Sequence, residues 1–180
     1  MPRLTSQDAS KYPAVVRYFQ DYFPHVHTKS KVWKAFLKWS LLPEELARKL
    51  IASGSLPIVD FKNLTMKDGR KPNGLHRDSQ PEFIFLHERI GRFYETAKRP
   101  EWKKAELVLE STVLHEMVHF GNYLASASLE SKKLQAQGGA GGYTKVKGKL
   151  KEVGKMFETE AYGKDIGDST WWSKTSCGSC

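Results

Sequence analysis

The sequence predicts an α+β fold that is mostly helical, with a small β-sheet beside one long helix. Apolar residues recur at helical spacing in both halves of the chain, whereas residues 56–90 contain two short stretches of β-forming residues. The 180 residues include five Trp, seven Tyr and nine Phe, and 39% are hydrophobic, which is enough for one core. We therefore expect a single domain over residues 1–165 and a tail over residues 166–180.

The N-terminal part of the chain is expected to be helical over residues 10–52. Three helices are predicted there, at Tyr12–Phe23, Lys31–Trp39 and Pro43–Ala52. A loop that carries His25 and His27 is expected after the first of them, because Pro24 interrupts the helical pattern. Neither histidine has a carboxylate or a cysteine close by in sequence, so we interpret them as an exposed pair.

Two strands are expected to form the small sheet. Leu56–Phe61 and Glu82–His87 have β-rich character, and a turn-forming segment separates them. An edge strand offers unpaired backbone groups to which an extended peptide can add. We expect Phe83–Glu88 to be such an edge strand beside a peptidase site, with His87-Glu88 as a surface pair.

Two helices are expected after the sheet. Trp102–Ala127 holds apolar residues at helical intervals and contains no proline. A second helix is predicted over residues 148–163, where an apolar stripe is formed by Leu150, Val153, Phe157 and Ala161. Between these helices, the polar and glycine-rich segment Ser126–Gly148 is expected to be a loop.

A metal site is predicted by His115-Glu116-Met117-Val118-His119, which lies inside the first of these helices. Residues four positions apart share one face of a helix, so the two imidazoles can bind one ion. A catalytic zinc site adds a third protein ligand and leaves one position open for water or substrate. Glu116 stands between the histidines and can act as the general base on that water. The motif therefore predicts Zn²⁺ as the cofactor.

The third ligand is expected to come from the helix over residues 148–163. Positions 122 and 125 hold Asn122 and Ala125 instead of the glycine and third histidine of a longer zinc motif. Glu158 is the preferred ligand, because Gly154 one turn earlier leaves room for close approach. Glu160 is the alternative ligand, or else a residue that orients a ligand histidine.

Tyr162 is predicted to project beside the metal, one turn after Glu158. Its hydroxyl group could then donate a hydrogen bond to the oxyanion that forms when water attacks a peptide carbonyl. In this mechanism Glu116 removes a proton from the water and later passes it to the leaving amine.

The histidine motif and the later Phe157-Glu158-x-x-Ala161-Tyr162-Gly163 resemble the zincin metallopeptidases, and more narrowly the bacterial toxin domains of that clan. The likeness covers residues 80–165. It implies a zincin-like fold and a zinc-dependent endopeptidase that acts on a protein or peptide substrate. Deuterolysin-type peptidases share a similar run around the two histidines, but their aspartate-ligand segment has no counterpart soon after His119.

Toxin domains of this kind are often the C-terminal cargo of type VI secretion spike and Rhs proteins. The resemblance therefore implies an antibacterial or host-directed effector toxin, made in the bacterial cytoplasm and delivered into the periplasm or cytoplasm of a target cell. It further implies fusion to or loading on a secretion spike, and an immunity protein in the producer. The first thirty residues show no secretory signal, which agrees with a route that does not depend on a signal peptide.

Charge and composition leave two other functions open. The net charge of +9 favours anionic partners, but the basic residues are dispersed and accompany no nucleic-acid-binding motif. No apolar run is long enough to span a membrane. The alternatives are a zinc amidase or peptidase that acts on cell-wall peptides, and a non-catalytic basic module that binds metal. Cys177 and Cys180 are interpreted as a free or locally oxidised pair in the tail.

Overall fold

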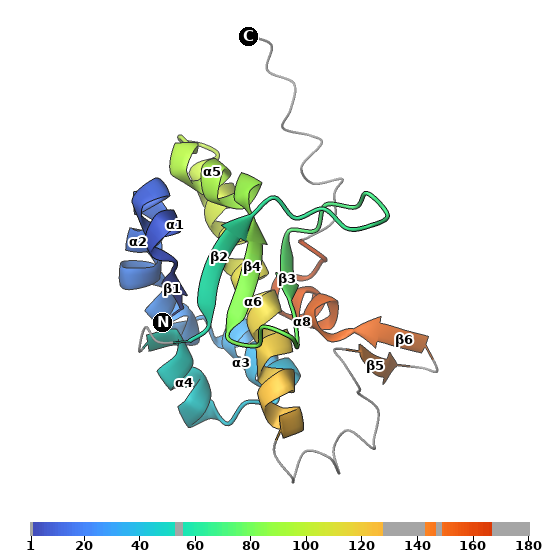
Figure 1. Cartoon of the computed structure of the whole chain (residues 1–180). Coiled ribbons are helices and arrows are strands. Elements are labelled where there is room, and N and C mark those ends of the chain that lie inside the picture. Colours follow the sequence, from blue (N-terminus) through green and yellow to red (C-terminus); the bar gives the residue numbers. More distant parts are fainter. Residues whose placement is uncertain (1, 53–55, 128–142, 147–148, 167–180) are drawn as a thin grey trace.

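The structure, a computed structural model, describes residues 2–52, 56–127, 143–146 and 149–166. A four-stranded sheet packs against a long central helix, α6, which crosses behind it, and further helices surround this pair (Figure 1). The expected α+β class is confirmed. No helix in these ranges is long and apolar enough to cross a membrane.

The sheet has the strand order β1-β2-β4-β3. Its strands are β1 (Arg3–Leu4), β2 (Ile58–Lys62), β3 (Gly74–His76) and β4 (Phe83–His87). β1, β2 and β4 run parallel to one another, and β3 is antiparallel to β4. A separate two-stranded hairpin consists of β5 (Tyr143–Val146) and β6 (Lys149–Glu152).

The prediction that Phe83–Glu88 is an edge strand is wrong. β4 lies inside the sheet, between β2 and β3, and Glu88 already belongs to the next helix. β3 occupies the edge instead. The sequence did not reveal β3 because its three residues directly follow a segment rich in turn-forming residues, too short to show any alternation.

The N-terminal region is more divided than expected. Its helical elements are α1 (Ser6–Lys11), α2 (Pro13–Arg17), the π-helical turn η1 (Tyr18–Tyr22), the 3-10 turn η2 (Phe23–Thr28), α3 (Ser30–Ser40) and α4 (Glu44–Ala52). The helices predicted at Lys31–Trp39 and Pro43–Ala52 are confirmed as α3 and α4. The predicted loop around His25 and His27 is a 3-10 turn, in which His27 Nδ1 lies 2.6 Å from the Pro24 carbonyl oxygen.

Three helices follow the sheet. They are α5 (Glu88–Thr96), α6 (Trp102–Ala127) and α8 (Val153–Tyr162). α6 has the predicted bounds, whereas α5 was not predicted, because it continues directly from β4 with His87 as its N-cap. The helix predicted over residues 148–163 begins five residues late, since β6 occupies the first part of that range.

One face of the sheet packs against α6 and forms the core. The registers Val59 with Ile84 and Phe61 with Leu86 place four buried side chains on this face. Full burial of an aliphatic or aromatic side chain contributes about 1.5 to 3 kcal/mol, so this layer is a large part of the stability.

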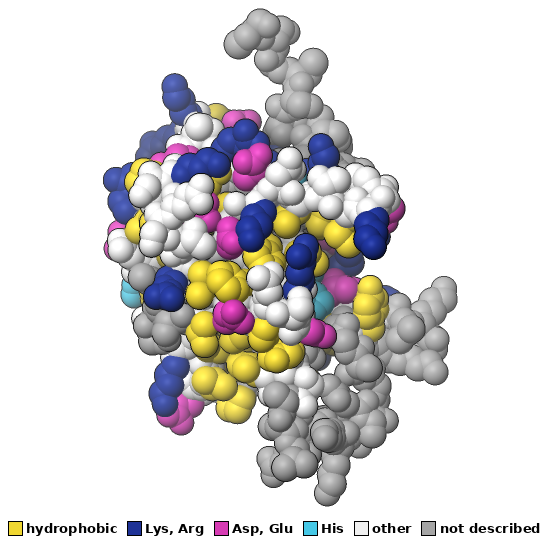
Figure 2. Space-filling model, viewed as in Figure 1, with side chains coloured by type: hydrophobic (Ala, Val, Ile, Leu, Met, Phe, Trp, Pro, Cys, Tyr) yellow, Lys and Arg dark blue, Asp and Glu magenta, His cyan; other side chains and the backbone are white. Residues whose placement is uncertain are grey.

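The other face of the sheet carries Phe85, which is also buried. There the Phe85 ring lies under Lys62 Nζ, 4.5 Å from the ring centroid, and under the guanidinium of Arg77, at 5.4 Å. Figure 2 views the molecule from this side and shows Lys and Arg side chains interspersed with hydrophobic ones.

α8 packs against both α3 and α6, and this packing brings the C-terminal part of the described chain to the histidine motif. The predicted loop Ser126–Gly148 falls largely outside the described residues, although β5 lies within it. Cys177 and Cys180 also lie outside them.

Candidate metal centre

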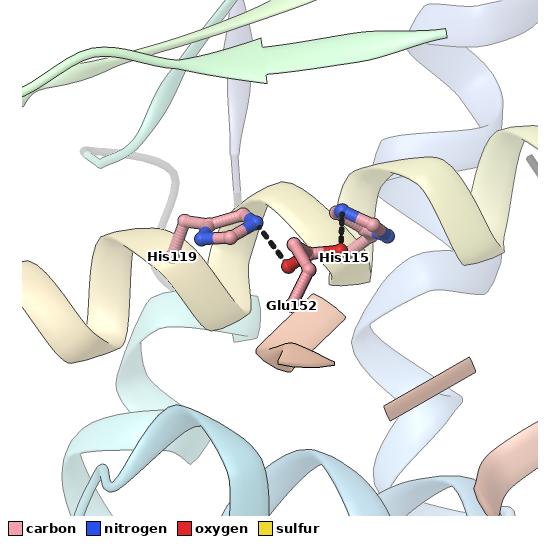
Figure 3. A group of neighbouring side chains, drawn as sticks. All are labelled: His115, His119 and Glu152. Carbon is pink, nitrogen blue, oxygen red and sulfur yellow. Dashed lines mark ion pairs between the residues drawn. The ribbon is translucent and has the colours of Figure 1, made fainter. Parts of the chain in front are cut away.

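Two histidines from α6 and one glutamate from the start of α8 form a cluster with metal-ligand spacing. One donor atom from each of His115, His119 and Glu152 lies within 4.8 Å of the other two. His119 Nε2 is 2.8 Å from Glu152 Oε1, and His115 Nε2 is 3.4 Å from Glu152 Oε2. Figure 3 shows both imidazoles on the same side of α6, facing the carboxylate. The predicted histidine pair is thus brought together around a carboxylate that was not predicted.

Glu152 reaches the cluster because it joins β6 to α8. It is the N-cap of α8, and its carboxylate accepts hydrogen bonds from the backbone N–H groups of Gly154 and Lys155. A negative charge at a helix N-terminus also interacts favourably with the helix dipole. Glu152 was not predicted at the cluster, because residues 148–163 are predicted as one helix, whereas β6 ends and α8 begins there. Lysine alternates with uncharged residues from Lys145 to Lys151, and this alternation is the signal for a strand that could have revealed the junction.

Glu158, the predicted third ligand, contacts the other ring nitrogen of His115. Its Oε1 atom is 2.8 Å from His115 Nδ1, and its Oε2 atom accepts a hydrogen bond from the Ile166 N–H at 2.6 Å. The side chain is buried. A carboxylate at Nδ1 holds the proton on that nitrogen and leaves the lone pair of Nε2 available for a cation.

Glu160 and Tyr162 both form hydrogen bonds with residues outside the cluster. Glu160 Oε2 accepts hydrogen bonds from Lys38 Nζ at 2.7 Å and from Trp39 Nε1 at 2.8 Å. The histidine-orienting contact predicted for Glu160 is made by Glu158. The Tyr162 hydroxyl donates to Glu110 Oε1 at 3.3 Å.

Glu110 was not singled out in the sequence. It is buried on α6, and its Oε2 atom accepts hydrogen bonds from Lys29 Nζ at 2.6 Å and from the Tyr18 hydroxyl at 3.3 Å. With Tyr162 on its other oxygen, Glu110 joins the end of α8 to α6 and to the N-terminal helices. The only signal in the sequence is an acidic residue within an apolar helix.

Glu116 is buried, and two glycines allow the close packing around it and around His115. A Cβ atom at Gly74 would collide with the Glu116 carboxylate, so β3 packs directly on this side chain. A Cβ atom at Gly154 would collide with the His115 imidazole. The expectation that Gly154 permits a close approach is confirmed, although the group it admits is the imidazole ring.

The carboxylates dominate the electrostatics of the cluster. Burial by itself lowers the pKa of His115, but the Glu158 hydrogen bond and the charges of Glu116 and Glu152 raise it to about 9. Burial also raises the pKa of Glu116, which the two histidines partly oppose. Burial favours the neutral form of Glu152 as well, yet its contacts with His119 and His115 bring its pKa down to about 2.

Three carboxylates and two imidazoles therefore gather in one cluster, in which Glu116 and Glu158 are buried and the other three side chains are half-buried. This excess of negative charge is what a divalent cation neutralises. Two imidazole nitrogens and one carboxylate oxygen are also the ligand set that zinc takes in many catalytic sites. By its donor atoms and its charge, the cluster fits such an ion.

Comparison with known families agrees with this chemistry. A family model described as metallopeptidase toxin 3 matches residues 8–163, which is most of the chain. The match includes α6, β6 and α8, and so all three residues of the cluster. No curated protein and no solved structure matches the chain.

Proposed function

Because the chain belongs to the metallopeptidase toxin 3 family, we propose that it is a zinc-dependent endopeptidase of the zincin type. The observation that carries this proposal is the convergence of His115, His119 and Glu152, with Glu116 between the two histidines in sequence. In peptide hydrolysis, a buried carboxylate next to two imidazole nitrogens and one carboxylate oxygen can remove a proton from water that a metal ion activates.

In this proposal His115, His119 and Glu152 would hold the ion, and Glu158 would orient His115. Zinc in such a site supplies a Lewis acid that polarises a carbonyl and lowers the pKa of water. Glu152 replaces Glu158 as the proposed third ligand, since its carboxylate faces the Nε2 atoms of both histidines.

Glu116 is the proposed general base. Its burial raises the pKa of the carboxyl group, which makes the carboxylate a stronger acceptor for a proton from the attacking water. The same oxygen can then pass that proton to the leaving amine. Because Glu116 is buried, its carboxyl group is suited both to removing the proton from water and to passing it to the amine.

β3 is the proposed binding strand for the substrate. It borders only β4 among the described strands, and Gly74 brings it into contact with Glu116. A peptide that added to the outer edge of β3 would have its backbone positioned by strand hydrogen bonds close to the base. This assigns to β3 the role expected for Phe83–Glu88.

We further propose that Tyr162 is a positioning residue and not the oxyanion donor. Its hydroxyl group is hydrogen-bonded to Glu110, and burial raises its pKa. Tyr162 is the last residue of α8, the helix that also carries Glu158 and begins at Glu152. A bond from this end of α8 to α6 keeps the two helices in register at the cluster.

The test compares wild type with Glu116→Gln and, as a matched control on the surface, Glu160→Gln. Zinc content is measured together with cleavage of casein. We expect stoichiometric zinc in all three proteins, chelator-sensitive cleavage by wild type and Glu160→Gln, and a loss of at least about 10²-fold in Glu116→Gln. Wild-type protein that contains no zinc, or undiminished cleavage by Glu116→Gln, would contradict the proposal.

The biological role proposed here is that of a secreted effector toxin. The family description supports toxicity, and delivery on a type VI spike with an immunity protein in the producer remains a prediction from the resemblance. Expression of wild type and Glu116→Gln in bacteria, with and without export to the periplasm, tests it. We expect growth arrest with wild type alone, in one compartment. Release of fragments from purified peptidoglycan would instead favour the cell-wall amidase.

A further inference from the structure

A second polar cluster lies at the beginning of α5, on the other face of the sheet. His87 is the last residue of β4, and its backbone N–H donates to the Asn73 carbonyl oxygen at 2.7 Å. This bond continues the β3–β4 ladder by one pair beyond Gly74 and Leu86. Strand positions alternate between faces, so Asn73 and His87 project opposite to Gly74, which faces Glu116.

Arg89 joins these two side chains. Its backbone N–H donates to His87 Nδ1 at 3.2 Å, and its guanidinium donates to Asn73 Oδ1 at 2.6 Å and to the Lys71 carbonyl oxygen at 2.8 Å. The three residues therefore form one connected group at the N-terminus of a nine-residue helix.

These contacts determine which atoms remain as donors. Because His87 Nδ1 accepts a hydrogen bond, the neutral imidazole carries its proton on Nε2. Asn73 Oδ1 also accepts a hydrogen bond, from the Arg89 guanidinium, so the Nδ2 group of the same amide remains as a donor. Neither His87 Nε2 nor Asn73 Nδ2 has a hydrogen-bond partner among the described residues, although the two residues are only 5% and 8% exposed. Buried donors without an acceptor are rare in folded proteins.

The surrounding charge is positive. Burial lowers the pKa of His87, and the charges of Arg89, Lys71 and Arg92 lower it further, against the opposing charge of Glu88. Glu88 is itself paired, with Arg92 at 2.9 Å and with Lys11 at 3.6 Å. The N-terminus of α5 adds the positive end of its dipole. His87 thus remains a neutral donor near pH 7, in a positive environment.

We propose that the Nε2–H group of His87 and the Nδ2–H group of Asn73 bind one small inorganic anion, of the size of chloride, at the N-terminus of α5. The free groups are donors, so the ligand must be an acceptor. Both residues are buried, so we expect a small ion. The backbone N–H of Arg89 orients His87, and its guanidinium orients Asn73. The positive charge of that guanidinium also favours an anion over a neutral water molecule.

The anion would act on β3. Asn73 directly precedes Gly74, so an ion bound at Asn73 and His87 would tie the start of β3 to β4 and α5. Among the described strands β3 pairs only with β4, and at Gly74 it packs on Glu116. We therefore expect the anion to stabilise the strand that borders the proposed base.

Bromide, which scatters anomalously, is the direct probe. In crystals of the full chain soaked in sodium bromide, we expect one anomalous peak within hydrogen-bonding distance of His87 Nε2 and Asn73 Nδ2. No peak at that position, or density for a water molecule that bromide does not replace, overturns the proposal. A peak on surface lysines alone is an adventitious ion only and overturns it as well.

Thermal unfolding gives the second measurement. At constant ionic strength, replacement of gluconate by chloride should raise the unfolding midpoint in a saturable way, by about 3 to 6 °C at a tenfold excess over Kd. Asn73→Asp, which places a negative charge at the donor position, should abolish the increment, whereas Asn63→Asp on the exposed chain after β2 should keep it. An unchanged increment in Asn73→Asp contradicts the assignment, and if that variant does not fold, the bromide experiment on wild type decides. Neither result depends on peptidase activity.

Discussion

Glu158 accepts a hydrogen bond from Nδ1 of His115 at 2.8 Å, on the side of the ring opposite to the nitrogen that faces Glu152. Two carboxylates, one at the N-cap of α8 and one within that helix, thus contact the two nitrogens of one imidazole. The proposed metal ligand and the proposed orienting group are therefore different residues, and the two roles can be tested apart.

We expect Glu152→Ala to abolish stoichiometric zinc binding, because it removes one of three proposed ligands. Glu158→Gln should retain zinc with an affinity lowered by about 10- to 100-fold, as is typical when a group that orients a ligand is lost. Competition with a zinc chelator measures both affinities. The reverse order, with Glu158 essential and Glu152 dispensable, would restore Glu158 as the ligand.

Tyr162→Phe distinguishes a positioning role from an oxyanion donor. Loss of the hydrogen bond to Glu110 should lower the free energy of unfolding by about 0.5 to 1.5 kcal/mol. We expect kcat to change by only a few fold. Zinc affinity should fall to the extent that α8 moves away from α6, because α8 begins at the proposed ligand Glu152. Tyr22→Phe, at an exposed tyrosine, is the control. A fall in kcat of about 10² or more, at full zinc affinity, would identify Tyr162 as the donor.

Alanine at each of the two close-packed glycines should impair a different step. Gly154→Ala places a methyl group against the His115 imidazole, so we expect weaker zinc binding. Gly74→Ala places a methyl group against the Glu116 carboxylate, so we expect near-normal zinc binding and a lower kcat. Zinc titration and casein cleavage on both proteins check this. An equal loss of zinc binding in both variants would contradict this prediction, because it would indicate that the added methyl groups unfold the protein generally.

Zinc should stabilise the fold, because its proposed ligands come from α6 and from the start of α8. At a thousandfold excess over Kd, the folded state gains about 4 kcal/mol, which corresponds to a rise in the unfolding midpoint of roughly 8 to 16 °C. His119→Ala should remove this rise, and Glu160→Gln should keep it. A wild-type midpoint that does not respond to zinc or to a chelator would argue against a site shared by the two elements.

Glu110→Gln tests the buried contact that joins α6 to the N-terminal helices. The Lys29 ammonium would lose a charged partner at 2.6 Å, and Glu110 is the buried member of this pair. Hydrogen bonds to charged groups contribute about 1.5 to 3 kcal/mol, so a loss near this size is expected in urea unfolding. Glu45→Gln, which breaks an exposed pair with Lys49, should cost less than about 0.5 kcal/mol. Equal losses of unfolding free energy in the two variants would show that the buried pair contributes no more to stability than the exposed one.

Local patterns in the sequence were sufficient for the α+β class, for the bounds of α6 and for the alignment of His115 and His119. These features depend on helical periodicity within one segment, which side-chain spacing reports directly. The placement of β4 inside the sheet could not be read in this way, because it depends on β3, a strand of three residues that is stable only when paired.

Which of Glu152, Glu158 and Glu160 lies nearest to the Nε2 atoms of the two histidines depends on the tertiary structure alone. All three glutamates lie within nine residues, and their chemistry is the same. What separates them is where β6 ends, which side of α8 meets α6, and which partner lies nearest to each carboxylate. The sequence by itself determined that two imidazoles share one helix face, because four residues make about one helical turn. Only the packing of α8 on α6 and α3 decided which carboxylate meets them, because that contact joins segments more than thirty residues apart.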